Sequence, residues 1–197
     1  MRVQRFGEHR AMPWANGLGT SYEVASDRNA DGEWTWRVAI APVVLDGPFS
    51  VMPGVDREMV VIEGNGMVLN IDDESVKCMP GQVVRFFGDS VTIASLVDGP
   101  VVDLGLMTVR DSVIGSMVVI ADAGDHTLDS DVFLKANSFV SNQVSLNTIS
   151  SSGNLGDSSL VEGCTSGQLV FKRPSNSTGN TVVKLSYNAA LPYGTKA

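Results

Sequence analysis

Short strand-like runs separated by turn-forming residues constrain this chain more than any other feature of its sequence. They follow one another at a spacing of about ten residues: WTWRVAIAPVV, REMVVIEG, GMVLNID, GQVVRFF, DSVTIASLV and PVVDLGLMTV. Runs of this length bounded by Gly, Pro and Asp are typical of antiparallel strands in a sandwich or barrel. No segment has the apolar spacing of a long amphipathic helix, and eight Pro with 20 Gly favour turns. The sequence therefore predicts an all-β protein.

Alternation within the first run assigns its side chains to two faces. Trp34, Trp36, Val38 and Ile40 would face one side, and the other side would take Thr35, Arg37, Ala39 and Ala41. Arg37 is then expected to point away from the tryptophans. A later run, VIGSMVVIADAG, is also interpreted as strand and turn.

The composition of the chain changes after about residue 110. Asn137 to Asn180 is crowded with Ser, Asn, Thr and Gly, yet apolar pairs such as Leu160/Val161 recur in it. Disordered segments are usually rich in charge and poor in apolar residues, so these pairs indicate further strands with polar outer faces. We expect residues 1–110 to form one β-domain and residues 111–197 a second. An unrelated C-terminal extension is the alternative.

Charge and composition exclude several classes of function. The 197 residues are 43% hydrophobic and 18% charged, which is ordinary for a globular protein. A net charge of −8, with 14 scattered Lys and Arg, disfavours nucleic acid, whose binding needs clustered basic residues. No apolar run approaches the roughly 20 residues that cross a bilayer, and MRVQRFGEHR lacks the apolar centre of a signal peptide. We expect a cytoplasmic protein with no nucleic-acid and no membrane partner.

Residues that bind metals are scarce. Cys78 and Cys164 lie far apart in no Cys/His cluster, and the histidines are His9 and His126 alone. Neither a zinc site nor a disulfide framework is indicated, and both cysteines are interpreted as buried or half-buried thiols. Imidazole and carboxylate sites for transition metals need several such residues converging from neighbouring strands. We therefore expect no metal and no cofactor.

Two turn-rich segments, Pro13–Glu23 (PWANGLGTSYE) and Asp46–Glu58 (DGPFSVMPGVDRE), each carry a large aromatic residue. A plain linker would not place Trp14 and Phe49 among residues that fix unusual backbone angles. Aromatic side chains beside glycines and polar groups can form the wall of a small-molecule pocket. Spacing alone slightly favours the alternative, in which two ordered turns plug the core with their aromatic side chains.

In order, spacing and residue type, these segments resemble the HutD/Ves family of bicupin proteins. The resemblance covers PWANGLGT with Tyr22-Glu23, WRVAIAPV, DGPFS, PGVDR, EGNGMVLNI, FFGD and DGPVVDLGLM, which is roughly the first half of the chain. It implies cupin-type antiparallel β-barrels, the second of them extrapolated because no motif in residues 111–197 matches. It also implies a role connected with histidine degradation and a formylglutamate-like ligand.

Three positions depart from the family pattern inside motifs that resemble pocket walls. Family members usually have a basic residue where Ala15 stands and a glycine where Leu18 stands, and they tend to carry Asn where Gly105 stands. Ligand chemistry is therefore the property that the resemblance transfers least safely.

Arg57 is the best single anchor for an anion, because its planar guanidinium can hold a carboxylate through two parallel hydrogen bonds. The alternative is a partly exposed salt bridge to Asp56 or Glu58. Asn16 could exchange hydrogen bonds with a carboxylate or amide ligand, or could close its own turn. Together with the resemblance, this predicts the ligand-binding residues Trp14, Asn16, Gly17, Thr20, Phe49, Asp56 and Arg57.

Glu63 and Asp103 are the candidate general bases if the protein is an enzyme. Glu63 ends the apolar run MVVIE before a Gly-Asn-Gly turn, where it could point into a barrel mouth or cap the turn. Asp103 lies in the apolar run VVDLGLM, so it either faces outward or is paired within a site, because burying an unpaired charge is costly. Alternation favours the outward face; an inward Asp103 would have Arg37 or Arg57 as its partner.

The leading hypothesis is a metal-free bicupin that binds a small carboxylate metabolite and regulates histidine utilisation or related metabolism without catalysing a reaction. The rival is a metal-independent cupin isomerase or lyase acting on a carboxylated substrate. A β-rich interaction module displayed through the C-terminal half is a third hypothesis. The oligomeric state is left open, a homodimer included.

The scarcity of metal ligands predicts that the protein folds and stays folded without a transition metal. Protein purified without added metal should contain no stoichiometric zinc, iron, nickel or manganese by elemental analysis, and chelators should leave its circular dichroism unchanged. Stoichiometric metal whose removal unfolds the chain would contradict this prediction.

Overall fold

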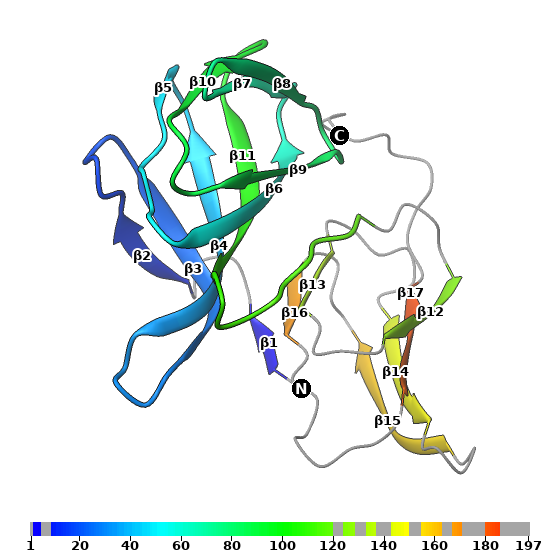
Figure 1. The fold of residues 1–197 in the computed structure, drawn as a ribbon. Helices are drawn as coiled ribbons and strands as arrows, with labels where there is room; N and C mark the ends of the chain where they lie inside the picture. The colour runs from blue at the N-terminus through cyan, green and yellow to red at the C-terminus, as the bar shows by residue number, and fades with distance from the viewer. Residues whose placement is uncertain are drawn as a thin grey trace. The chain divides into compact units, whose positions relative to one another are not determined.

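The computed structural model describes residues 9–119 fully, and elsewhere the backbone of seven strands (Figure 1). Backbone contacts divide the chain into two compact units, one holding His9–Val119 and the other holding the segment Ile120–Leu191. The boundary expected after residue 110 falls inside the first of these units. The second unit also includes β1 (Arg2–Gln4) from the start of the chain, which the sequence pattern did not predict.

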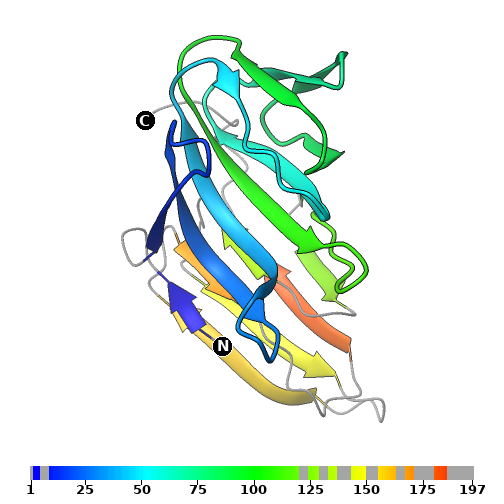
Figure 2. The same cartoon turned by 60° about the vertical axis from the view of Figure 1, so that its left-hand side comes forward.

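The first unit consists of two antiparallel sheets. Its strands are β2 (Arg10–Pro13), β3 (Thr20–Arg28), β4 (Trp34–Val43), β5 (Gly47–Pro48), β6 (Val55–Glu63), β7 (Met67–Ile71), β8 (Glu74–Cys78), β9 (Val83–Phe87), β10 (Thr92–Leu96) and β11 (Val101–Val109). One sheet has the order β2-β3-β4-β11-β6-β9 and the other β5-β10-β7-β8. Figure 2 shows β3, β4 and β11 as long neighbouring strands. All six strand runs predicted from the sequence are confirmed.

The second unit contains β12 (Gly124–Leu128), β13 (Phe133–Ala136), β14 (Gln143–Ile149), β15 (Leu155–Glu162), β16 (Gly167–Val170) and β17 (Asn180–Leu185). Its sheets have the orders β12-β17-β14-β15 and β1-β16-β13. The predicted strands in the Ser/Asn/Thr-rich half are therefore present; the apolar pair Leu160/Val161, for example, lies in β15. The predicted polar outer faces and Cys164 lie outside the described residues.

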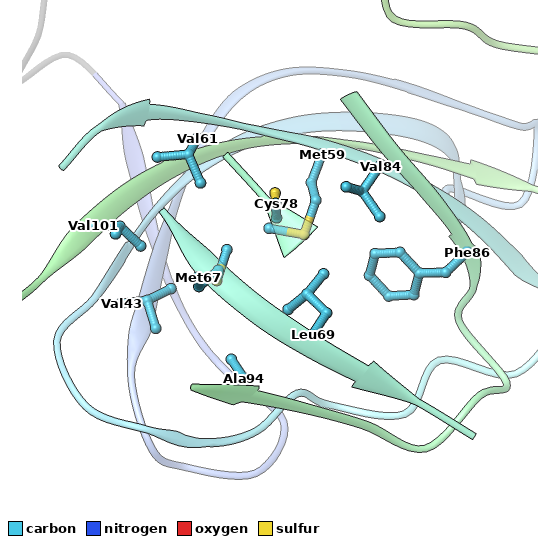
Figure 3. Close-up of a cluster of buried hydrophobic side chains, with 10 residues drawn as sticks. All are labelled: Val43, Met59, Val61, Met67, Leu69, Cys78, Val84, Phe86, Ala94 and Val101. Carbon is cyan, nitrogen blue, oxygen red and sulfur yellow. The ribbon is translucent and has the colours of Figure 1, made fainter. Parts of the chain in front are cut away.

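The core of the first unit lies between its two sheets. The six-stranded sheet contributes residues including Met59 and Val61 of β6, and the four-stranded sheet contributes residues including Leu69 of β7 and Cys78 of β8. Figure 3 shows these side chains meeting between the sheets. Cys78 is fully buried, as expected, and its burial raises the pKa of its thiol to about 11.

Two local predictions were wrong. The run that starts at Val113 is not a strand over residues 113–119, because the Met117 peptide is bonded to side chains instead of to another strand. Its N–H donates to Glu58 Oε2 at 2.6 Å, and its carbonyl accepts from Arg85 Nη2 at 3.1 Å.

Arg37 does not point away from both tryptophans, since its Cζ lies 4.8 Å above the Trp34 ring. The strand pairing shifts register opposite Trp34, between Asp27 and Arg28, so simple alternation fails there.

Candidate functional site

Asn16 joins the two turn-rich segments at one end of the barrel. Its Nδ2 donates to the carbonyl of Pro48 at 2.8 Å, and its Oδ1 accepts from the Leu18 N–H at 3.0 Å. Gly17, whose φ is +72°, donates its N–H to the Trp14 carbonyl at 2.9 Å. Asn16 therefore closes its own turn, as one of its two predicted roles required, and also ties this turn to the strand before Phe49.

The aromatic residues of both segments pack against the same core. Trp14 and Phe49 are half-buried against the cluster that contains Met59 and Phe86. The Trp14 indole N–H donates to Ser21 Oγ at 2.7 Å. A Cβ at Gly19 would lie 2.7 Å from the indole ring, so only glycine lets Trp14 fold back over its own turn. The structure thus packs both predicted aromatic residues against one core cluster.

Two arginines face inward on one row of paired residues. Met107 of β11 is the register partner of Arg37 on β4 and of Arg57 on β6. Met59 lies two residues beyond Arg57 on β6 and belongs to the core, so Arg57 shares that inner face. We call Arg37, Arg57 and Asp103 the inner site.

Arg57 is held mainly by aromatic rings. Its Cζ lies 5.2 Å from the centre of the Phe49 ring and 4.9 Å from that of Phe86, and Nη1 donates to the Ser50 carbonyl at 3.4 Å. Burial lowers the pKa of Arg57, the negative charge of Asp103 raises it, and Arg37 lowers it again. The group remains a cation, because guanidinium does not lose its proton in proteins.

The surface ion pairs considered for Arg57 are taken by other residues. Asp56 accepts from Arg110 Nε at 2.8 Å, and Glu58 accepts from Arg85 Nε at 2.9 Å. Asp56 and Glu58 adjoin Arg57 in β6, so they project to the opposite face of the strand. Arg57 is therefore not a surface salt-bridge residue within the described part of the chain.

Arg37 has weaker partners still. Its Nη1 donates to Met12 Sδ at 3.6 Å and its Nη2 to Met107 Sδ at 3.5 Å, and thioether sulfur is a weak acceptor. Its buried Nε has no hydrogen-bond partner among the residues that the structure describes. Burial lowers its pKa, Glu23 raises it, and Arg28 lowers it. Arg37 thus retains unused donors inside the barrel.

Asp103 is buried, with 7% of its surface exposed, so the interpretation of an outward-facing carboxylate was wrong. Alternation predicts a face only where one side of a strand is solvated, and β11 also buries Leu104 beside Asp103. Burial raises the pKa of Asp103 to about 7, and the positive charge of Arg57 opposes this rise. The inward alternative, with Arg57 as the neighbouring charge, is the one that the structure shows.

Asn16 and Gly17 bond to backbone groups of the turns and not to the inner site. Three further predicted site residues also lie away from this cluster. Asp56 is held on the other face of β6. Thr20 precedes Ser21, which reaches Trp14, so alternation turns Thr20 to the opposite side of β3. Glu63 is exposed at the last position of β6, about 20 Å along the strand from Arg57.

Sequence reasoning did not single out Glu23, Met12 or Met107 as parts of the site. Glu23 is the register partner of Ala39, one row from the two arginines, and its charge acts on Arg37. Its position in the motif TSYE was visible, but only the pairing of β3 with β4 places it beside the arginines. For the two methionines the sequence offered core filling or adaptable packing around a cavity, and it could not decide between them because thioethers have no distinctive sequence signal.

A groove of about 660 Å³ lies on the surface of the same unit, and its lining includes Arg57 and Phe86. The lining also includes the charged residues Asp56, Glu58, Arg85 and Arg110. These four already form ion pairs with one another, or with Asp89 in the case of Arg110. Among the arginines of the groove, Arg57 is therefore the one whose guanidinium is not engaged in an ion pair within the described part of the chain.

Within the described ranges, no group of three or more His, Cys, Asp or Glu side chains is arranged to hold a metal ion. The part of the chain that the structure describes also contains no helix with the length and apolar character needed to span a membrane.

Two antiparallel sheets enclosing buried ionisable groups define a cupin-type β-barrel protein. The chain belongs to the HutD family, which matches its residues 7–174. Protein Ves of Citrobacter koseri is 36% identical over 107 residues, covering 52% of this chain and 56% of that protein. An uncharacterized 21.2 kDa protein in the hutC 3′ region of Pseudomonas putida is 32% identical over 110 residues, covering 54% of this chain and 57% of that protein. The chain thus spans little more than half the length of these curated relatives.

Solved structures extend the match to the whole fold. HutD from Pseudomonas fluorescens, in a formate condition, is 24% identical with a TM-score of 0.52, covering 95% of this chain and 98% of that one. A conserved protein of unknown function from Pseudomonas aeruginosa is 24% identical with a TM-score of 0.51, covering 94% of this chain and 98% of that one. The chain therefore has the bicupin fold, as the resemblance implied.

The raised pKa of Asp103 predicts that the free energy of unfolding falls as the pH rises. Its pKa is raised in the folded state, so between about pH 4 and pH 7 the folded protein keeps a proton that the unfolded chain has released. Raising the pKa from 3.8 to about 7 corresponds to up to about 4 kcal/mol of unfolding free energy, and this contribution is lost across this pH range. In Asp103→Asn the side chain is neutral at every pH. The part of the slope of unfolding free energy against pH that comes from Asp103 should therefore disappear.

Urea unfolding at several pH values, followed by tryptophan fluorescence, measures this slope. Trp14, Trp34 and Trp36 all lie in the first unit, so the signal reports on the unit that contains Asp103. Asp73→Asn, at an exposed turn, is the matched control and should keep the wild-type slope. An unchanged slope in Asp103→Asn would contradict the prediction.

Proposed function

We propose that this HutD-family protein binds a small carboxylate metabolite in its inner site and regulates histidine utilisation or related metabolism. The observation that carries the proposal is the pair Arg37 and Arg57, two inward-facing cations in one row of the barrel wall. Neither guanidinium donates a hydrogen bond to a carboxylate within the described residues. Each keeps donors that an anionic ligand can use.

Two surface arginines of the same unit provide a contrast. Arg85 and Arg110 donate to carboxylates at 2.7 to 2.9 Å, whereas Arg37 and Arg57 contact thioethers, aromatic rings and one carbonyl. Burying a cation without a hydrogen-bonded anion is costly, and a bound carboxylate removes part of that cost. The aromatic walls exclude water, which strengthens the attraction between guanidinium and carboxylate.

A formylglutamate-like compound fits this set of groups. Its two carboxylates match two guanidinium groups, and its amide N–H matches the oxygen atoms of Asp103. The printed names of the relatives support the metabolic connection, since one is HutD and another is encoded in a hutC 3′ region. The HutD structure was obtained in a formate condition, and formate is the simplest carboxylate.

The ligand is a small-molecule carboxylate, bound without a metal or cofactor, and the protein acts in the cytoplasm without binding nucleic acid or a membrane. The net charge of −8 supports the exclusion of nucleic acid.

Asp103 supports a second candidate function, a metal-independent isomerase or lyase acting on a carboxylated substrate. A carboxylate whose pKa is raised to about 7 is suited to general-base catalysis near neutral pH. Glu63 is the weaker candidate because it is exposed at the far end of β6. Proton NMR of N-formyl-L-glutamate incubated with the protein separates the functions: an unchanged spectrum supports binding, whereas new product signals or deuterium incorporation from heavy water support catalysis.

Replacing Arg57 should weaken carboxylate binding more than replacing any other predicted site residue. Arg57→Ala should cost about 2 to 5 kcal/mol of binding free energy, if a desolvated charge-assisted contact is lost. Arg57→Lys should also bind more weakly, because it keeps the charge but loses the planar fork. Asn16→Ala should weaken binding less than either Arg57 variant does, because both polar atoms of Asn16 already bond to backbone groups of the turns. Calorimetric titration with N-formyl-L-glutamate measures all three changes.

Arg85→Ala is the matched control, because Arg85 lies on the neighbouring strand β9 and is already paired with Glu58. It removes the same charge from the protein and should leave the affinity nearly unchanged. If Arg57→Ala binds as tightly as the wild type, or if Arg85→Ala weakens binding equally, the proposal is wrong.

A further inference from the structure

Gly105 lies in the middle of β11, on the inner face and between the two ends of the inner site. It is two residues from Asp103 and two residues from Met107, so all three side-chain positions share one face. Its register partners are Ala39 on β4 and Met59 on β6. The row between the arginines and Asp103 thus contains one position with no side chain and one with only a methyl group.

The protein's own structure does not require glycine at this position. A Cβ added to Gly105 would meet Asp103 Oδ1 at 3.8 Å, Met107 Cε at 3.9 Å and the Ala39 carbonyl at 4.0 Å, which are ordinary contacts. Gly105 is also absent from the glycines with a positive φ. By contrast, a Cβ at Gly64 or Gly88 would lie 2.5 Å from a backbone oxygen. Those two glycines are needed for packing, and Gly105 is not.

A glycine inside a strand has a cost that packing does not explain here. Glycine loses more conformational freedom on folding than alanine, and in strand interiors it often marks the close approach of a ligand. The atom nearest to the missing Cβ is a carboxylate oxygen of Asp103, and Gly105 is itself only half-buried. The position that a side chain would occupy at Gly105 therefore lies directly beside Asp103.

We propose that Gly105 determines ligand specificity by holding open the space beside Asp103, so that the site selects carboxylates that carry an N–H substituent. The inference rests on the proposed function and names the part of the ligand that this function left unassigned. The arginines take the carboxylates, the substituent lies over Gly105, and its N–H donates to Asp103. A carboxylate without the substituent leaves this space empty and the Asp103 oxygen without a donor.

Two compounds and three variants test the assignment. N-formyl-L-glutamate and glutarate share the same dicarboxylate chain, but only the first carries an N–H substituent. Gly105→Ala adds one methyl group that the unliganded protein has room for, so its melting temperature should match or exceed that of the wild type. Gly105→Val fills more of the space. Gly47→Ala is the matched control, a strand glycine with nothing within 4 Å of its added Cβ.

Calorimetry should show wild type binding N-formyl-L-glutamate more tightly than glutarate. Gly105→Ala should lower the affinity for N-formyl-L-glutamate by about tenfold, as expected for the loss of one hydrogen bond. It should change the affinity for glutarate by less than about threefold. Gly105→Val should lower the affinity for N-formyl-L-glutamate further, and Gly47→Ala should change the affinity for neither compound.

Other outcomes overturn the inference in distinguishable ways. If the wild type binds both compounds equally, or if Gly105→Ala weakens both equally or neither, Gly105 does not select the substituent, although the carboxylate-binding function stands. If the wild type binds neither compound, the proposed function and the inference fall together.

Discussion

The inner site of the first unit keeps two guanidinium groups inside a β-barrel without a hydrogen-bonded carboxylate among the described residues. Arg37 and Arg57 are instead surrounded by aromatic rings and thioethers, which solvate a cation only weakly. Burial lowers the pKa of both arginines and raises that of Asp103, so each member of the inner site is strained electrostatically. Clusters of this kind are more common at binding and catalytic sites than in ordinary cores.

Strand register makes this cluster possible. The pairing of β4, β11 and β6 sets Arg37, Met107 and Arg57 in one row, with Ala39, Gly105 and Met59 in the next. The turns that hold Trp14 and Phe49 are tied together by Asn16 at the barrel end. A rigid wall of paired strands keeps charged groups at fixed separations more precisely than loops can, which suits the recognition of a small ligand.

The strands and the aromatic turns could be predicted from the sequence, because alternation and turn residues are local signals. The inner site could not be predicted in full, because it depends on which residues of distant strands face one another. Asp103 shows the difference: a solvated outer face was the simplest interpretation of an Asp in an apolar run, but β11 buries residues on both faces. Similarly, the shifted register near Trp34 brought Arg37 over the ring from which alternation had separated it.

The central claim is that Arg37 and Arg57 receive the two carboxylates of one ligand inside the barrel. Proton–nitrogen NMR of the arginine Nε–H groups tests it directly, with each signal assigned by a single Arg→Lys variant. On titration with N-formyl-L-glutamate, the Arg37 and Arg57 signals should shift together with one dissociation constant, while those of Arg85 and Arg110 stay in place. Shifts confined to Arg85 and Arg110, or no shift at Arg37 and Arg57 at saturating ligand, would contradict the account.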